Sequence, residues 1–559
     1  MRGDGSVVEL PVAHLHEATV GSARERLRLL VAAVALLLLD SCVNVAHLFI
    51  ARGMSQYREL AVRRALGAPA LRIARRALFE GVLVSLAGGA AGLLLASVAL
   101  KAFLILDPVS MPRASAITLD ARVLAFTTAL AAVTAVCFGV IPSMRAIRAD
   151  PAAALRSGGR SRTGHLRERS TREALVIAEV AVSFLLVFHA CLLTRSFLRM
   201  NGAPLGFRVE DVWTVRIGLH GDEDGEPWRD RMGRMAEAVR AAPGVRSVTY
   251  GLSAPLEHVG GTCCWSRPVA PGEGDATAPA VDAAIHPYDP PWVDVLEPGI
   301  LAGEPWTAAA HQAPIAPALL NEALARQLFG SVEAALRRDI DIGAARHEVV
   351  GVVGDSRHYG PQRDPGPALY VPIESVPFTP DRLTLVARVS PGLDDVAVRL
   401  RQAIWDVEPL LPLPTIRSME DWASRAMARA RFDGWLFGTF AGAALLLAAT
   451  GIGGTLMYRV RIDTRALGIR LALGASRRSV EARVLGRGLG TTGAGLLIGS
   501  LLALTTRPLL ESRLFGLAPT DATTLLGAAG VLVATAAVAS WLPAHRAGAV
   551  DPVETLRRD

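Results

Sequence analysis

The chain has 559 residues, 51% of them hydrophobic, a formal net charge of +7 and a mean hydropathy of +0.34. Its apolar residues are concentrated in blocks, which excludes a single soluble core and indicates a membrane protein of several units. Its arginines cluster beside these blocks, as in a membrane orientation signal, so nucleic acid is excluded as a partner.

Seven apolar blocks are long enough to cross a hydrocarbon core of ~30 Å. In chain order they are 27–51, 81–106, 123–141, 174–193, 435–457, 484–505 and 522–542. The second block contains GGAAG at Gly88–Gly92, which predicts a surface for close helix packing. Loops 52–78, 145–172 and 459–483 and the C-terminal tail are rich in arginine, so the positive-inside rule places them in the cytoplasm and residues 195–433 outside.

Strand-like and helix-like pieces alternate in the region 195–433. The predicted strands are VWTVRIGL, VRSVTYGL, HEVVGVVGD, ALYVPI and LTLVARV, and the predicted helices are DRMGRMAEAVRAA and LDDVAVRLRQAIWDV. The fold class is therefore an α-helical membrane protein, with about seven transmembrane helices in two repeated units and one large α+β extramembrane domain.

An eleven-residue stretch occurs twice, as RELAVRRALGA at Arg58–Ala68 and as RALGIRLALGA at Arg465–Ala475. Each copy lies between two apolar blocks and ends in Leu-Gly-Ala. A proline followed at the same spacing by an Asp-Pro pair also recurs, at Pro142 with Asp150 and at Pro543 with Asp551. These matches indicate an internal duplication of a membrane unit.

These residues resemble the FtsX/MacB-type permeases of ABC transporters, in particular the duplicated acidobacterial-type (ADOP) permeases. Besides the repeat, the resemblance is carried by Asn44–Ala68, Val460–Ser476, NEALARQLFG at Asn321–Gly330 and VVGVVGDSRH at Val349–His358, and it covers almost the whole chain. It implies a multi-pass protein of the bacterial inner (plasma) membrane with a MacB-like periplasmic domain.

The resemblance also implies four spans per unit, with the periplasmic domain after the first. We therefore expect residues 1–26 to be the end of a missing periplasmic domain, 27–156 the first FtsX-like membrane unit with three spans, 157–194 a cytoplasmic linker and the fourth span, 195–433 the periplasmic domain, and 434–559 the second FtsX-like unit with three spans. An N-terminal truncation, natural or from a gene start placed too late, would explain the incomplete first unit. The second repeat departs from the family at Ala466, where a Glu equivalent to Glu59 is usual.

Each repeat suits an amphipathic helix at the cytoplasmic membrane surface that ends at a glycine cap. In the family such a segment is the coupling helix that docks on the ATPase. The coupling residues predicted are Arg58, Glu59, Arg63, Arg64, Leu66, Gly67 and Ala68 in the first copy, and Arg465, Gly468, Arg470, Leu473, Gly474 and Ala475 in the second. The alternative is an ordinary connector whose arginines set the topology.

Six polar residues fall inside or at the edges of the spans, where charge is costly: Asp40, Asn44, His47, Glu80, Glu179 and Arg487. The first three share one helix face, which we expect to turn inward and to hydrogen-bond neighbouring helices. Glu80 and Arg487 occupy equivalent positions in the two units and could pair across the unit interface. Glu179 is interpreted as a packing or interface group.

No enzyme motif is present. Lys101 is the only lysine, so the phosphate-binding loop G-x-x-x-x-G-K-[ST] is missing, as are G-x-S-x-G and H-E-x-x-H. Cys263 and Cys264 are adjacent, without the His or Cys spacing of a zinc site. We therefore expect no cofactor, no metal and no catalytic residue.

The resulting hypothesis is a permease subunit of an ABC transporter. A separate cytoplasmic ATPase would engage both repeats and move the periplasmic domain to export an antibiotic, a peptide or a lipoprotein. Besides membrane lipid, a second permease copy or a periplasmic or outer-membrane factor stays open as a partner. Two alternatives remain: a non-transporting sensor or scaffold, and an ion-coupled secondary transporter using Asp40 and His47, which predicts a broken helix in both repeats.

Overall fold

The structure is a computed structural model that describes residues 28, 30–45, 70–106, 120–148, 162–219, 227–257, 266–272, 279–307, 314–412, 414–511 and 514–550. The chain divides into two compact units. One comprises Leu198–Arg429, and the other comprises the segments before and after it.

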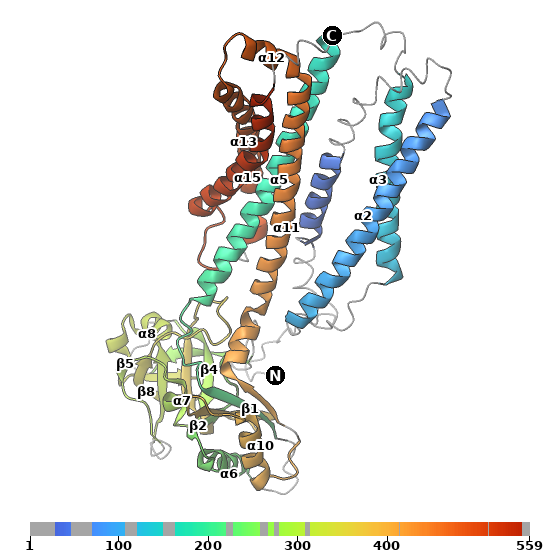
Figure 1. Ribbon diagram of the computed structural model, residues 1–559. Helices are drawn as coiled ribbons and strands as arrows, with labels where there is room; N and C mark the ends of the chain where they lie inside the picture. Colours follow the sequence, from blue (N-terminus) through green and yellow to red (C-terminus); the bar gives the residue numbers. More distant parts are fainter. Residues whose placement is uncertain are drawn as a thin grey trace, which may run out of the picture. The chain divides into compact units, whose positions relative to one another are not determined.

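The flanking segments form a helical unit (Figure 1). Its described helices are Leu30–Val45, α2 (Ala70–Leu106), α3 (Ala121–Arg148), α5 (Arg162–Asn201), α11 (Met419–Ile462), α12 (Thr464–Ala472), α13 (Arg477–Thr505), α14 (Arg507–Glu511) and α15 (Ala522–Gly548). Six of the seven predicted blocks fall within one of these helices, and residues 30–45 of the first block are helical too. Five contain a segment long and apolar enough to cross a membrane, and Leu30–Val45 and Ala121–Val133 are shorter apolar helices.

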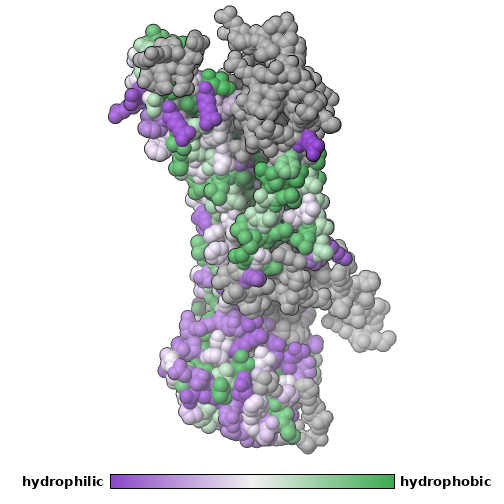
Figure 2. All heavy atoms as spheres, turned by 45° about the vertical axis from the view of Figure 1, so that its right-hand side comes forward, coloured by the Kyte–Doolittle hydropathy of each residue, from purple (hydrophilic) through white to green (hydrophobic). Residues whose placement is uncertain are grey.

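On the face shown in Figure 2, hydrophobic side chains gather over the middle of the helical unit, as expected of helices that face lipid. Helix α5 is the exception, because most of its apolar segment is buried against its neighbours. Phe184, Leu186 and Phe188 of α5 pack in one core with residues of α11, α13 and α15. Helix α5 is therefore the centre of the second repeat's bundle.

Two glycines let α13 approach α5 closely. A Cβ added to Gly495 would lie 2.5 Å from Cγ1 of Val180, and one added to Gly499 would lie 2.8 Å from the carbonyl oxygen of Ala181. Small residues four positions apart allow backbones to come this near, which increases dispersion contacts between helices in lipid. Gly495 and Gly499 therefore form the seam between these two helices.

The other unit is built on an eleven-stranded mixed sheet in the order β11-β1-β10-β2-β4-β3-β7-β8-β6-β9, with β5 paired to β8. The strands are β1 (Val212–Gly218), β2 (Val245–Gly251), β3 (Ser266–Pro271), β4 (Val281–Tyr288), β5 (Ile300–Gly303), β6 (Ala316–Asn321), β7 (Asp339–Ile342), β8 (Ala345–Val353), β9 (Ala368–Pro372), β10 (Arg382–Val389) and β11 (Thr415–Ser418). Each of the strands predicted by name is present, which confirms the α+β class.

The helices of this unit are α6 (Trp228–Ala241), α7 (Trp292–Leu296), α8 (Glu322–Phe329), α9 (Val332–Ala335) and α10 (Val396–Val407). Helices α6 and α10, both predicted, pack on the part of the sheet formed by β1, β10 and β2, where Met235 and Leu400 are fully buried. Strand β10 lies between β1 and β2 and pairs antiparallel with both. The strand–helix–strand segment at the start of the unit is thus split by a strand from much later in the chain.

The strands from β4 to β9 in the sheet order form a closed ring, since β4 pairs with β9 as well as with β3. Helices α8 and α9 pack against this closed part, burying Leu324 and Ala335 completely. An aromatic cluster supports β4 and β9, with the rings of Trp292 and Tyr370 stacked at 4.4 Å between centroids. Burial of these large rings contributes strongly to the stability of the unit.

Asn321 fastens β6 to the segments that follow β8 and precede β9. Its side-chain oxygen accepts hydrogen bonds from the backbone N–H groups of Leu324 (3.0 Å) and Ala368 (2.8 Å). Its amide nitrogen donates to Oδ1 of Asp355 (2.7 Å) and to the carbonyl oxygen of Gly366 (2.9 Å). Asn321 is only 1% exposed. Because its amide group makes all four of these bonds, its hydrogen-bonding capacity is fully used.

A buried histidine in the aromatic cluster gives the unit a pH dependence. The imidazole of His286 on β4 lies 3.9 Å from that of His358 between ring centroids, and its Nε2 has no hydrogen-bond partner among the described residues. Burial lowers the pKa of His286 from 6.5 to about 4, because the charged form loses its hydration. The unit must therefore hold this ring neutral.

We expect His286→Phe to reduce the acid sensitivity of the unit. Because the folded-state pKa is lowered, His286 contributes stability that is fully present above pH 6.5 and is lost as pH falls toward about 4. Urea titrations of the full chain in detergent, at steps across this range, should show a shallower fall for the variant than for the original chain. Parallel curves would contradict a neutral His286 in the folded state.

Candidate functional site

The second repeat folds as a short helix between two spans. Helix α12 begins after Asp463, directly beyond the end of α11, and ends shortly before Ser476, which caps α13. Leu467, inside α12, is 8% exposed and belongs to the core shared with α5 and α13. One side of α12 is therefore fixed to the bundle.

The Leu-Gly-Ala sequence that ends the repeat has a structural explanation. Gly474 has a φ of +92°, which a residue with a side chain rarely adopts. The N–H of Gly474 donates to the carbonyl of Leu471, and the N–H of Ala475 donates to that of Arg470, both at 3.1 Å. This is the Schellman arrangement, which satisfies the last carbonyls of a helix. Gly474 thus ends α12 where the sequence predicts a cap.

The opposite side of α12 exposes apolar side chains. Leu473 is 82% exposed and Ile469 is 41% exposed, next to the exposed guanidinium of Arg470. Gly468 is buried, and the backbone of Arg465 lies in the first turn of the helix. A rigid, capped helix that presents leucine and isoleucine beside arginine has the composition of a protein-docking surface.

The first repeat lies outside the described residues. This applies to Arg58, Glu59, Arg63, Arg64, Leu66, Gly67 and Ala68, and also to His47 among the intramembrane residues. The prediction that two such helices exist therefore stays a prediction for the first copy.

Two of the predicted polar residues of the first span are buried against α5 and α11. Oδ2 of Asp40 accepts a hydrogen bond from Ser183 of α5 at 3.3 Å. The side-chain nitrogen of Asn44 donates to Oγ1 of Thr450 at 2.6 Å and to the carbonyl oxygen of Leu447 at 3.4 Å, both on α11. The helix Leu30–Val45 is thereby joined to the bundle of the second repeat by polar contacts inside the membrane segment.

Glu179 of α5 is also buried, with 1% of its surface exposed. Its carboxyl group rests against Gly451 of α11, where an added Cβ would lie 2.1 Å from Oε2. Neither oxygen has a hydrogen-bond partner among the described residues.

The described helices of the spans run without a break through their apolar segments, unlike the broken helices that an ion-coupled transporter would use.

Arg487 lies near Asp463, the residue that precedes the first turn of α12. Its Nη1 lies 3.9 Å from Oδ2 of Asp463. The side chain of Glu80 lies outside the described residues, so the predicted pairing of Glu80 with Arg487 stays a prediction.

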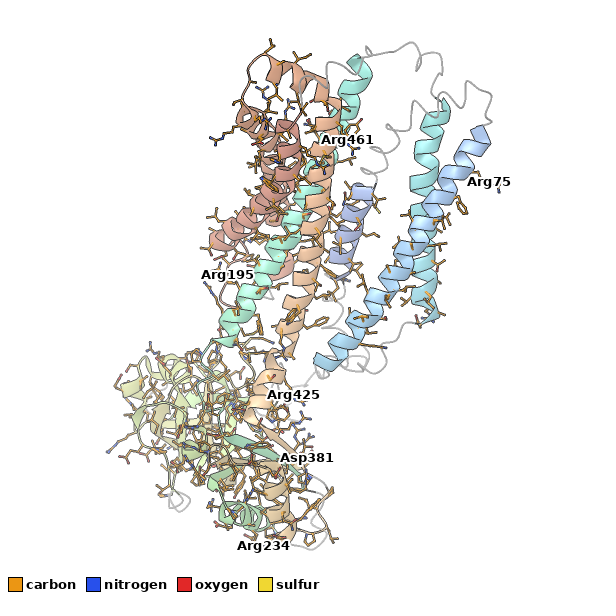
Figure 3. All side chains as sticks on the ribbon, in the orientation of Figure 1. Arg75, Arg195, Arg234, Asp381, Arg425 and Arg461 are labelled. Atoms are coloured by element: carbon orange, nitrogen blue, oxygen red, sulfur yellow. The ribbon has the colours of Figure 1, made fainter. Side chains whose placement is uncertain are left out.

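One polar contact was missed by the sequence analysis. Arg195 lies near the end of α5 (Figure 3). It forms an ion pair with Asp521 and donates a hydrogen bond to Thr524 at 2.7 Å. Asp521 caps α15 by accepting from the N–H of Thr524 at 2.8 Å. The sequence Asp-Ala-Thr-Thr at the start of an apolar block is an N-cap signal that could have been noticed. Its partner on another helix could not.

Among the described residues, no group of three His, Cys, Asp or Glu side chains is placed to hold a metal ion. The described residues instead offer a docking helix, buried polar contacts between spans and a large sheet domain.

Comparisons with known proteins agree with this arrangement. The model of the FtsX-like permease C-terminal family matches residues 31–151 and 438–552, and that of the MacB-like periplasmic core domain matches residues 174–403. The first match occurs twice, as expected of a duplicated membrane unit. The two models together match most of the chain.

Curated relatives include the pyoverdine export ATP-binding/permease protein PvdT of Pseudomonas fluorescens, 36% identical over 46% of this chain and 40% of that protein. The macrolide export ATP-binding/permease protein MacB of Wolinella succinogenes is 26% identical over 43% of this chain and 38% of that protein. The chain thus spans less than half the length of these relatives. Among solved structures, the periplasmic region of MacB from Actinobacillus actinomycetemcomitans covers 40% of this chain and 95% of its own, at 14% identity and a TM-score of 0.28. On the two family matches, the chain belongs to the FtsX/MacB-type permeases.

Proposed function

We propose that this chain is the permease subunit of an ABC exporter in the bacterial inner membrane, and that a separate cytoplasmic ATPase docks on α12 and on Arg58–Ala68. The observation that carries the proposal is the exposed apolar end of α12, formed by Ile469 and Leu473, on a helix that is otherwise capped and fixed to the bundle. The names of the relatives contain the words ATP-binding, permease and export, which supports export rather than import as the direction of transport.

Force applied to α12 would pass into the spans on both sides of it. Helix α12 follows α11 after one residue, and Ser476, which caps α13, comes two residues after Gly474. Helix α11 is a single helix of 44 residues, roughly 66 Å long, that begins directly after β11. An ATPase that pulls on α12 would thus act on the periplasmic domain through one continuous helix, and a substrate such as an antibiotic, a peptide or a lipoprotein would be expelled there.

The topology supports this assignment. The match to the MacB-like periplasmic core domain and the single apolar segment of α11 support a cytoplasmic position for α12, one crossing away from the sheet domain. The arginines in and around the last turn of α11 and in α12, including Arg461 in Figure 3, agree with this orientation.

The proposal predicts that Leu473→Glu abolishes the association with the ATPase. A carboxylate at an apolar contact remains desolvated and unpaired, so we expect at least a tenfold loss of copurified ATPase when the tagged chain is coexpressed with a cytoplasmic ABC ATPase from the same organism. Leu410→Glu is the matched control, since Leu410 is 95% exposed in the periplasmic domain. Equal ATPase recovery with all three chains would rule out docking through α12.

A further inference from the structure

A basic pocket lies between α12 and the ends of the two spans that α12 joins. It encloses about 180 Å³, which is the volume of roughly six water molecules. Four arginines line it: Arg459 of α11, Arg470 of α12, and Arg483 and Arg487 of α13. A single carboxylate, that of Asp463, lines it with them.

The positive charge of this pocket is only partly neutralised. Arg459 forms an ion pair with Glu173 of α5, and Arg487 lies 3.9 Å from Asp463. Arg470 and Arg483 form no ion pair with any described residue, and both are exposed. Two guanidinium groups thus remain available at the pocket for an anion, and guanidinium groups can bind phosphate oxygens through two parallel hydrogen bonds.

The rest of the lining is apolar. Val460, Leu467, Val480 and Val484 all contribute to it, and each is less than 9% exposed. The pocket lies where the apolar segments of α11 and α13 end, which is the level of the lipid headgroups. A pocket that combines arginines with buried apolar residues at the level of the headgroups suits an amphiphilic ligand better than a free ion.

We propose that this pocket binds the phosphate headgroup of an anionic phospholipid from the cytoplasmic leaflet. The phosphate would bridge Arg470 of α12 and Arg483 of α13, while the glycerol and upper acyl atoms contact the valines below. A lipid in this position would hold α12 against the two spans. The proposal concerns the pocket alone and does not depend on the ATPase.

The test is native mass spectrometry of the full chain in detergent, titrated with dioctanoyl phosphatidylglycerol. We expect one retained lipid, and a dissociation constant raised roughly 25-fold in the Arg470→Gln/Arg483→Gln double variant, since each arginine near a headgroup contributes roughly fivefold. Arg477→Gln/Arg478→Gln is the matched control, because these arginines belong to α13 but do not line the pocket. Its affinity should equal that of the original chain.

A second variant guards against a folding defect. Asp463→Asn removes the only carboxylate in the lining, and Asp463 makes no side-chain cap bond to α12, so the fold should tolerate the change. It should bind phosphatidylglycerol more tightly, an outcome that a damaged protein would not give.

Parallel titrations identify the source of the phosphate. Dioctanoyl phosphatidylcholine should bind more weakly, and inorganic phosphate should compete only poorly. Equal affinity for phosphatidylcholine, or inorganic phosphate that binds as tightly as the lipid, would overturn the proposal. So would unchanged lipid binding in the Arg470→Gln/Arg483→Gln variant, even if that variant had lost the ATPase, because the arginines would then serve the protein partner.

Discussion

Replacing Asn321 by alanine is expected to lower the free energy of unfolding of the periplasmic domain by about 3–4 kcal/mol. The change removes four hydrogen bonds at a fully buried position. It also leaves the N–H groups of Leu324 and Ala368 and the carbonyl of Gly366 without their partner, and an unsatisfied buried polar group costs more than the bond itself contributes. The lost free energy of unfolding is measured by urea titration of the full chain in detergent, with protease cleavage within residues 198–429 as the readout of unfolding.

Ser331→Ala is the matched control for this prediction. Ser331 caps α9 just as Asn321 caps α8, through one bond to the N–H of Ala334 at 3.2 Å, but that bond lies at the exposed surface. Its removal should cost about 1 kcal/mol. If the two variants lost the same stability, Asn321 would act only as a helix cap and its links to Asp355, Gly366 and Ala368 would contribute nothing.

The role of Asn321 shows what the sequence could and could not reveal. NEALARQLFG and VVGVVGDSRH are recognisable as family motifs, and the strand of the second motif is predicted from its apolar pattern, whereas β6, which leads into the first motif, is not among the predicted strands. In the folded domain the two motifs are joined by hydrogen bonds: the side chain of Asn321 donates to Oδ1 of Asp355, which also accepts from the N–H of Ala323 at 3.0 Å. This contact exists only because β6 and β8 pair in parallel, and pairing between distant strands is set by the tertiary fold rather than by either segment.

The same limit applies to the membrane helices. The positions of the apolar helices, the repeat in the sequence and the glycine cap of its second copy follow from local patterns of apolar residues, arginine and glycine. The GGAAG sequence of α2 predicts a close packing surface, yet an added Cβ at Gly88 or Gly92 would meet nothing within 4 Å among the described atoms, and one at Gly89 would lie 3.8 Å from the Cβ of Ala131. The close approach occurs instead at Gly495 and Gly499, because small residues permit helix contact but do not select the partner helix.

Replacing Gly499 by leucine is therefore expected to disrupt the second repeat. The new Cβ alone would lie 2.8 Å from both the carbonyl oxygen of Ala181 and Cδ1 of Phe184 on α5. The backbone of a buried helix cannot yield to a side chain of that size, so α13 must move away from α5, at a cost of about 3 kcal/mol. The variant should accumulate poorly in membranes, and its melting temperature in detergent should fall.

Gly493→Leu separates this effect from a general intolerance of large residues in α13. Gly493 is on the same helix, but its added Cβ would meet no described atom within 4 Å, so a leucine there should face open space. The control should accumulate to the original level and melt at the original temperature. If both variants were equally stable, the approach of α13 to α5 would be looser than Gly495 and Gly499 require. Since α13 carries two of the four pocket arginines, a displacement of α13 would also weaken lipid binding in Gly499→Leu.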